Sequence, residues 1–423
     1  MSKKPGFSRR DLLSLTGLVA GSAAVSPAFA QNDSSQNTDG DYAIQGGIGS
    51  GEKTGVLYEA ARGPWGMLNY FYFYLEAPAH LIEVFPLRNP RTRWAVPLEK
   101  EMEFLSVIDS IEMSPSQRQQ LRDPNRVGVA DGLYVIFPPE NLLVNLNPES
   151  RAKLYGYLER FEANQDIKNP VRIRSGSVDE WAAGTGMRPD LIEQMKLMVY
   201  KRGDLLVFAD FPHLISQAKS DAEARVLQKH SSRVRTMAVR LDVKNGPPVA
   251  EIMPYWTTGL GLRRKEVEPL IQAAMDTPGV SGLDLVHMLP PLPRKILYTY
   301  PDMSMAVEGV MPDCHWTALN FFNYNPEAIY LDEFFAASRL MSDFVQVEPP
   351  YRFGDALVFV TEEMNAHHSC IYIAADIVYT KNGRSLYAPW TVLHLNDVKS
   401  TYPDFNGKPL RIQGFRRKGG ANV

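Results

Sequence analysis

The chain has 423 residues, a net charge of −3 and 44% apolar residues, which is an ordinary composition for a globular protein. Its length suggests about two domains, each large enough to bury a core. Because positive charge is not in general excess, we do not expect nucleic acid as a partner, and we read the basic end at 416–418 as a solvated tail. Two cysteines are too few for a disulfide scaffold. They leave a reactive thiol, a single bridge, a metal site or core packing as options.

The first 30 residues indicate export from the cell. They combine a basic start, a modest apolar run to about Val25, a small-x-small cleavage site at 28–30, and the twin arginine of the segment SRRDLL. This pattern resembles a bacterial twin-arginine (Tat) signal peptide, with Leu12 where that family usually has Phe. A Sec signal or a short uncleaved anchor is the alternative. We expect cleavage after Ala30, a periplasmic or secreted mature protein, and no stable membrane span after cleavage.

Composition divides the remaining chain into three stretches. Residues 31–60 are polar and rich in Gly, Ser, Asn and Asp, which predicts a flexible leader. Residues 61–290 show a mixed but mainly helical pattern, for example a helix with Asn147 as its N-cap and Pro148 in its first turn. The segment MLPPLPRK at 288–295 predicts a linker. Residues 291–423 then form a second domain, and the fold class is α+β. No role for 61–290 is indicated.

A lone cysteine stands out in GVMPDCHWTALNFFN, residues 309–323. Pro312 and Asp313 suit the start of a helix, and the apolar residues after them continue with helical spacing. Cys314 should therefore lie in the first turn, where unpaired backbone N–H groups and the helix dipole lower a thiol pKa. A cysteine hydrolase needs such a thiol together with a nearby histidine.

The segment NAHHSCIYIAADIVYTKNG, residues 365–383, supplies that histidine. It reads as two strands of a hairpin. Because side chains alternate along a strand, one face should carry His368, Cys370 and Tyr372, and the other Ser369, Ile371 and Ile373. The second strand, 377–380, should then present a polar group beside His368.

The order of these motifs resembles the NlpC/P60 group of papain-like cysteine hydrolases. The matching segments are Asp313-Cys314, then the strand at 354–359 (GDALVF), then the strand at 368–373 (HSCIYI), within residues 296–395. The resemblance implies a helix carrying Cys314 packed on an antiparallel sheet carrying His368, with Cys314 as nucleophile and His368 as general base. It places the third polar residue, which orients the histidine, at Thr380, with Asn382 close behind it. The family usually has Ser-Gly after the cysteine, where this chain has His315-Trp316.

The expected function is therefore that of an exported amidase or peptidase working through an acyl-enzyme, without a cofactor. The resemblance and the export signal suggest a peptide or peptidoglycan-like substrate, in particular the stem peptides of peptidoglycan. The sequence gives no indication of the oligomeric state.

Three other interpretations remain open from the sequence. The papain-like domain could bind an envelope ligand without catalysis. A zinc ion could be held by two Cys and two His drawn from 314–315 and 367–370. Cys370 could be a packing residue, or it could form a bridge with Cys314 that switches the enzyme off.

Overall fold

The computed structural model describes residues 52–83, 91–174, 176–203, 205–257, 261–405 and 407–418. The predicted signal peptide, 1–30, and residues 31–51 of the predicted leader lie outside the described residues. The described chain is α+β with antiparallel sheets, and it divides into two compact units. One unit contains the chain up to Leu75 and from Arg235 onward, and the other contains Glu76–Val234. Among the described residues, no helix has the length and apolar character needed to cross a bilayer.

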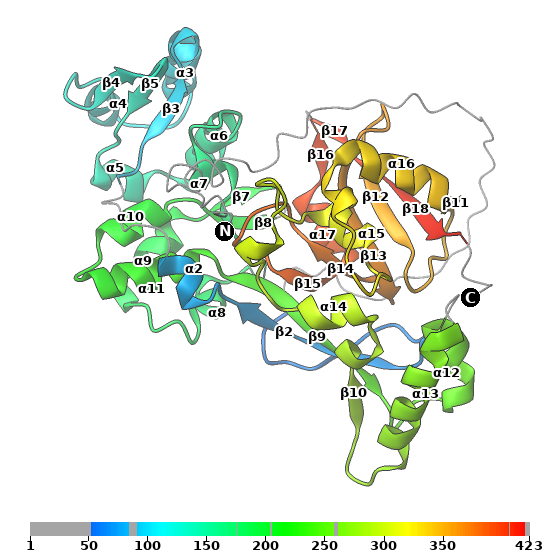
Figure 1. The fold of residues 1–423 in the computed structure, drawn as a ribbon. Coiled ribbons are helices and arrows are strands. Elements are labelled where there is room, and N and C mark those ends of the chain that lie inside the picture. The colour runs from blue at the N-terminus through cyan, green and yellow to red at the C-terminus, as the bar shows by residue number, and fades with distance from the viewer. Residues whose placement is uncertain are drawn as a thin grey trace, which may run out of the picture. The chain divides into compact units, whose positions relative to one another are not determined.

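The first unit is built on a six-stranded antiparallel sheet in the order β11-β18-β12-β13-β14-β15 (Figure 1). The predicted hairpin is confirmed, because β13 pairs antiparallel with β14 and Ile371 lies opposite Tyr379. The C-terminal strand β18 lies inside the sheet, between β11 and β12. The strands are β11 (Phe344–Val347), β12 (Ala356–Val360), β13 (Ala366–Ala374), β14 (Ile377–Lys381), β15 (Trp390–His394) and β18 (Arg411–Arg417).

Strand β18 corrects the prediction of a solvated basic tail. The Arg416 side chain in this strand makes a two-pronged ion pair with Asp355, with Nε–Oδ1 at 2.8 Å and Nη2–Oδ2 at 2.7 Å. Asp355 is 1% exposed, so the pair is buried on the carboxylate side. Arg416 is therefore held by the carboxylate of Asp355, which lies far from it in the chain and is not visible in the sequence around residue 416.

A second sheet of the same unit has the order β1-β2-β9-β10, from Tyr58–Glu59, Leu68–Leu75, Val234–Asp242 and Gly282–Asp284. Its first strand corrects part of the predicted leader, because β1 pairs with β2 and Tyr58 lies opposite Tyr70. The carboxylate of Glu52 accepts hydrogen bonds from the hydroxyls of Tyr70 at 2.8 Å and Tyr72 at 2.7 Å. Residues 52–60 are therefore ordered by partners further along the chain.

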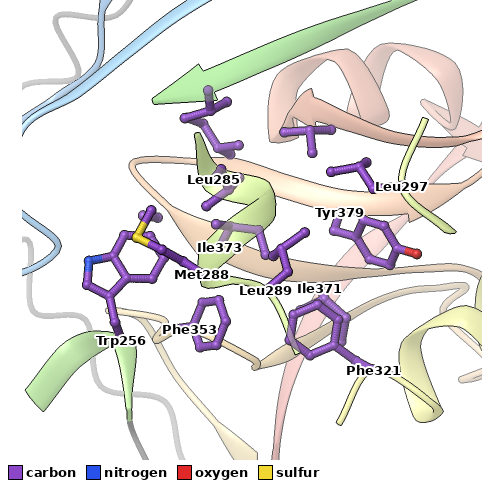
Figure 2. Close-up of a cluster of buried hydrophobic side chains, with 14 of the residues drawn as sticks. Trp256, Leu285, Met288, Leu289, Leu297, Phe321, Phe353, Ile371, Ile373 and Tyr379 are labelled. Carbon is purple, nitrogen blue, oxygen red and sulfur yellow. The ribbon is translucent and has the colours of Figure 1, made fainter. Parts of the chain in front are cut away.

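The apolar core of this unit explains why the chain does not divide near residue 290. Figure 2 shows side chains of β13 and β14, including Ile371, Ile373 and Tyr379, together with Trp256 and residues from 285–297. The Tyr255 hydroxyl also donates a 2.6 Å hydrogen bond to the carbonyl of Ile373. The proline-rich segment forms the short helix α14 (Pro291–Ile296), with Leu292 and Ile296 in this core. Residues 235–290 thus share one core with the C-terminal sheet.

Helices cover both faces of the six-stranded sheet. Trp316 and Leu319 of α15 (Cys314–Leu319) belong to the core that contains Ile371 and Ile373. On the opposite face, α17 (Leu395–Thr401) packs its Leu395 and Val398 against a cluster that includes Cys370 and Tyr372. The predicted alternation of β13 side chains between two faces is therefore confirmed. The unit also contains α12 (Val249–Trp256), α13 (Gly261–Asp276), α16 (Glu333–Asp343), the turns η2 (Leu285–Met288), η3 (Met303–Met305) and η4 (Ala328–Leu331), and a small hairpin of β16 (Asp404–Phe405) and β17 (Lys408–Pro409).

The second unit, Glu76–Val234, is mainly helical, as predicted for this part of the chain. The N-cap at Asn147 is confirmed, because its side chain accepts a hydrogen bond from the backbone of Ser150 at 2.7 Å. Inside the unit a buried ion pair joins Arg151 Nη1 and Asp210 Oδ2 at 2.7 Å. The helices are α2 (Ala79–Glu83), η1 (Leu98–Lys100), α3 (Glu101–Asp109), α4 (Pro115–Leu121), α5 (Glu140–Asn145), α6 (Pro148–Leu158), α7 (Gln165–Lys168), α8 (Val178–Ala182), α9 (Pro189–Met198), α10 (Phe211–Ser216) and α11 (Asp221–Ser231). Two three-stranded sheets accompany them in the described residues, from β3 (Trp94–Pro97), β4 (Val127–Ala130) and β5 (Leu133–Ile136), and from β6 (Val171–Ile173), β7 (Tyr200–Arg202) and β8 (Leu205–Phe208).

Candidate active site

The predicted helix that carries the cysteine is present as α15, and it begins at Cys314. Asp313 is its N-cap, with a carboxylate oxygen that accepts a hydrogen bond from the Trp316 backbone at 2.9 Å. The Thr317 hydroxyl donates to the backbone carbonyl of Asp313 at 2.6 Å. These bonds fix the first turn, so the thiol is held at the beginning of the helix. The helix packs against β13 and β14, the two strands of the predicted hairpin (Figure 1).

His368 lies near the start of β13 and is fully buried. Its Nε2 lies 3.0 Å from Oγ1 of Thr380 on the neighbouring strand. Its ring stacks on Tyr402, with 4.2 Å between ring centroids and an interplanar angle of 17°. Contacts on the edge and on the face of the ring thus fix its orientation.

The hydrogen bonds of Thr380 determine which nitrogen of His368 carries the proton. The Thr380 hydroxyl donates its single hydrogen to the carbonyl of Ser369 at 3.2 Å. With the hydroxyl donating to Ser369 it accepts toward His368, and this arrangement places a hydrogen on Nε2 and leaves Nδ1 unprotonated in the neutral ring. Nδ1 is buried and has no partner of regular hydrogen-bond geometry among the described residues. A buried ring nitrogen with a free lone pair can act as a general base.

The charge state of Cys314 depends on two imidazoles. Burial alone would raise the pKa of the thiol, because it disfavours the charged form. The charges of His315 and His368, and their hydrogen-bonding interactions with the sulfur, outweigh burial and lower the pKa of Cys314 to about 5. The site therefore favours a thiolate at neutral pH.

His315 is the second of these imidazoles, and sequence alone gives little sign of its proximity to the sulfur beyond its place next to Cys314. The side chain is partly exposed, and its Nδ1 lies 2.8 Å from the Ser369 hydroxyl. Burial alone would lower the pKa of His315, but the Cys314 thiolate, with smaller contributions from Asp313 and Glu333, raises it to about 9. At neutral pH the ring is then an imidazolium, and Nδ1 donates to Ser369.

Two basic side chains from the end of β14 and the turn after it also belong to this site. Lys381 is buried, and its Nζ donates to the carbonyls of Gly383 at 2.6 Å and Ser385 at 3.1 Å. Burial lowers the pKa of Lys381 to about 7, against the attraction of the negative charges on Asp313 and Cys314. Arg384 lies 3.3 Å from the Asp313 carboxylate and 3.0 Å from that of Glu333 on α16. In the sequence, Lys381 and Arg384 are marked only by their place in or next to a polar turn.

Of the four predicted catalytic residues, Cys314, His368 and Thr380 lie together. Asn382 does not hold the histidine, because the ring nitrogen that an orienting residue would bind is occupied by Thr380. Oδ1 of Asn382 is instead buried without a hydrogen-bond partner among the described residues. Of the two residues, Thr380 is the one that contacts the histidine.

The zinc interpretation finds no geometric support. Within the described ranges, no group of three or more His, Cys, Asp and Glu side chains is arranged to hold a metal ion. The ring of His367 lies against Phe405, with 4.1 Å between centroids. Both cysteines are free thiols. Burial raises the pKa of Cys370, and negative charge on Cys314 raises it further, so Cys370 is an unreactive packing residue.

Access to the sulfur is narrow, because Cys314 is 5% exposed and His368 is 0% exposed. The partly exposed neighbours are His315 and the loop 382–388, which carries Arg384. No family model, curated protein or solved structure matches this chain.

Proposed function

We propose that this protein is an exported papain-like cysteine hydrolase of the NlpC/P60 type that cleaves an amide bond through an acyl-enzyme. The observation that carries the proposal is the orientation of His368. Thr380 accepts the hydrogen on Nε2, and the free Nδ1 belongs to a ring that interacts with the Cys314 sulfur. A nucleophile, a base and an orienting group in this relationship are the elements of nucleophilic acyl transfer.

The proposed reaction follows from these atoms. The Cys314 thiolate attacks the carbonyl carbon, and a C–S bond forms while the carbonyl π electrons move to oxygen. The backbone N–H of Cys314, at the start of α15, donates to this oxyanion. Protonated His368 gives its Nδ1 proton to the leaving nitrogen as the C–N bond breaks. His368 then takes a proton from water, the water oxygen attacks the thioester, and the C–S bond breaks to release the acid and the thiolate.

The substrate class rests on the sequence. The resemblance to NlpC/P60 hydrolases and the twin-arginine signal together favour an envelope amide, and we propose the stem peptides of peptidoglycan. No cofactor takes part in the proposed steps. Export itself is tested by replacing the twin arginine, Arg9→Lys with Arg10→Lys, which should leave the full-length protein in the cytoplasm of a Tat-competent bacterium. Continued periplasmic accumulation would contradict the Tat assignment.

The test of the hydrolase is digestion of purified peptidoglycan by the mature protein, with products identified by mass spectrometry. We expect Cys314→Ala and His368→Ala to lower turnover by at least about 10³-fold, as the loss of a nucleophile or its base does. Cys370→Ala is the matched control, since it removes a buried thiol two residues from His368, and it should keep most activity. New products that persist in Cys314→Ala would contradict the assignment of the nucleophile.

A second function is favoured by one observation, the low exposure of both Cys314 and His368. A papain-like site that is closed to solvent could bind an envelope peptide or glycan without cleaving it. Sedimentation of the protein with insoluble peptidoglycan distinguishes the two functions. Binding that is unchanged in Cys314→Ala, with no product from either protein, would establish the binding function in place of the hydrolase.

A further inference from the structure

We propose that His315 supplies most of the positive charge that keeps Cys314 ionised in the free protein, and that Ser369 positions it, while His368 transfers the protons. This assignment of different roles to the two imidazoles rests on the proposed function only in taking Cys314 as the nucleophile. It assigns roles to His315 and Ser369 that the hydrolase mechanism above does not need.

The two imidazole rings are held by different residues. His368 is held through Nε2 by Thr380, at 3.0 Å. His315 is held through Nδ1 by Ser369, at 2.8 Å. Ser369 follows His368 directly in β13, so the two side chains leave the strand on opposite faces. One short piece of strand therefore orients two imidazoles, one that it carries and one that α15 brings.

Ser369 also links the two hydrogen-bonding systems. Its carbonyl accepts the Thr380 hydrogen, which sets the tautomer of His368, while its hydroxyl meets Nδ1 of His315. Because the hydroxyl can accept, an imidazolium at position 315 can donate from Nδ1 to Ser369 and keep its Nε2–H free. A serine at this point therefore suits an imidazolium.

The charges around His315 stabilise its imidazolium form. Against the effect of burial, the Cys314 thiolate makes the largest contribution to the raised pKa of this ring. Asp313, the N-cap of the same helix, and Glu333 of α16 add smaller contributions. Arg384 pairs with both carboxylates and reduces their effect. The remaining titratable groups around the sulfur and the His315 ring are His367, His368 and Cys370 on β13 and Lys381 on β14.

A second imidazolium adds to the stabilisation of the free thiolate that His368 provides. The charges on His315 and Cys314 support each other, because the thiolate raises the pKa of His315 to about 9 and the imidazolium lowers that of the thiol. The pH at which Cys314 ionises should then depend on His315 more than on His368.

The test measures ionisation of Cys314 without any substrate. In a Cys370→Ala background, where Cys314 is the remaining thiol, the ultraviolet absorbance of the thiolate is followed from about pH 4 to about pH 10 and checked by the rate of iodoacetamide alkylation. We expect a midpoint near pH 5 for this parent protein. His315→Gln should raise the midpoint by more than about one pH unit, and Ser369→Ala should raise it by a smaller amount. His368→Ala should shift it less than His315→Gln does, while abolishing hydrolysis.

The outcomes separate this inference from the hydrolase proposal. An unchanged midpoint in both His315→Gln and Ser369→Ala, or a larger shift in His368→Ala than in His315→Gln, would overturn the role of His315. If His315→Gln does not fold by circular dichroism, Ser369→Ala with Ser369→Thr as its conservative rescue decides the matter alone. A low midpoint that depends on His315, found in a protein that leaves peptidoglycan intact, would support this inference while contradicting the hydrolase.

Discussion

Thr380 Oγ1 lies 3.0 Å from Nε2 of His368, and the two residues meet because β14 returns antiparallel beside β13. The same hydroxyl donates to the carbonyl of Ser369, so its contact with the ring has a defined direction. In cysteine hydrolases a carboxylate or an amide accepts the hydrogen of the imidazole, and Thr380 is placed to accept it here. The acceptor here is neutral, so it orients the ring without adding a negative charge beside it.

The first prediction concerns this orienting bond. Thr380→Val keeps the shape of the side chain but leaves the buried Nε2–H without an acceptor, which costs about 1–3 kcal/mol. We therefore expect kcat/KM to fall by about 10- to 100-fold, because the ring adopts the wrong tautomer or turns. Thr380→Ser restores the hydroxyl and should recover most activity. Equal activity of the Val and Ser variants would show that Thr380 does not orient His368.

The second prediction concerns the pH dependence of stability at Lys381. Because burial lowers its pKa to about 7 from 10.5, the unfolded chain binds one more proton than the folded chain between these values, and stability should rise with pH there. Lys381→Met removes this dependence on pH. The free energy of unfolding of wild type should therefore rise relative to that of the variant from about pH 7 to about pH 10. Urea unfolding at several pH values measures it.

Lys399→Met is the control for the lysine prediction, since Lys399 is exposed. Its free energy of unfolding should run parallel to that of wild type across the same pH range. Parallel curves for Lys381→Met as well would mean that Lys381 titrates normally in the folded protein.

The third prediction concerns the ion pair between Arg416 and Asp355. Arg416→Met leaves a buried carboxylate without its partner. We expect a loss of about 3 kcal/mol in the free energy of unfolding. This is the lower end of the range for a broken buried ion pair, because Arg416 is partly exposed. Arg417→Met, one residue further on and exposed, should cost less than about 0.5 kcal/mol. Similar losses in the two variants would show that the buried carboxylate does not need Arg416.

The fourth prediction concerns Gly354, the residue before Asp355. Its φ is +88°, and a Cβ on it would lie 2.2 Å from Cζ of Phe322. Gly354→Ala must therefore strain the backbone and displace an aromatic ring, and we expect a loss of at least about 2 kcal/mol, measured by denaturant unfolding. Gly128→Ala adds a Cβ with nothing within 4 Å and should change stability little. A stable Gly354→Ala protein would mean that the Phe322 ring can move aside at little cost.

Local patterns in the sequence were sufficient for several elements. The helix start at Cys314, the N-cap at Asn147 and the two faces of β13 all follow from side chains within a few residues of each other. A cap bonds to the next turn of its own helix, and strand alternation is set by backbone geometry, so neither needs a distant partner. The position of Thr380 beside His368 was instead expected from the resemblance to NlpC/P60 hydrolases, which places a polar residue on the strand after the histidine.

Features that depend on distant partners were decided only by the tertiary structure. The proline-rich segment at 288–295 reads as a linker, yet it lies on the core shared with β13, and the basic end reads as a tail, yet Arg416 finds Asp355. The choice of Thr380 over Asn382 and the position of His315 beside the sulfur depend on how α15 and β14 pack on β13. The sequence by itself determined which side chains carry the candidate chemistry, because residue type and local spacing fix that. Only the fold decided which of them share a hydrogen bond, because a hydrogen bond depends on distances of a few tenths of an ångström between segments far apart in the chain.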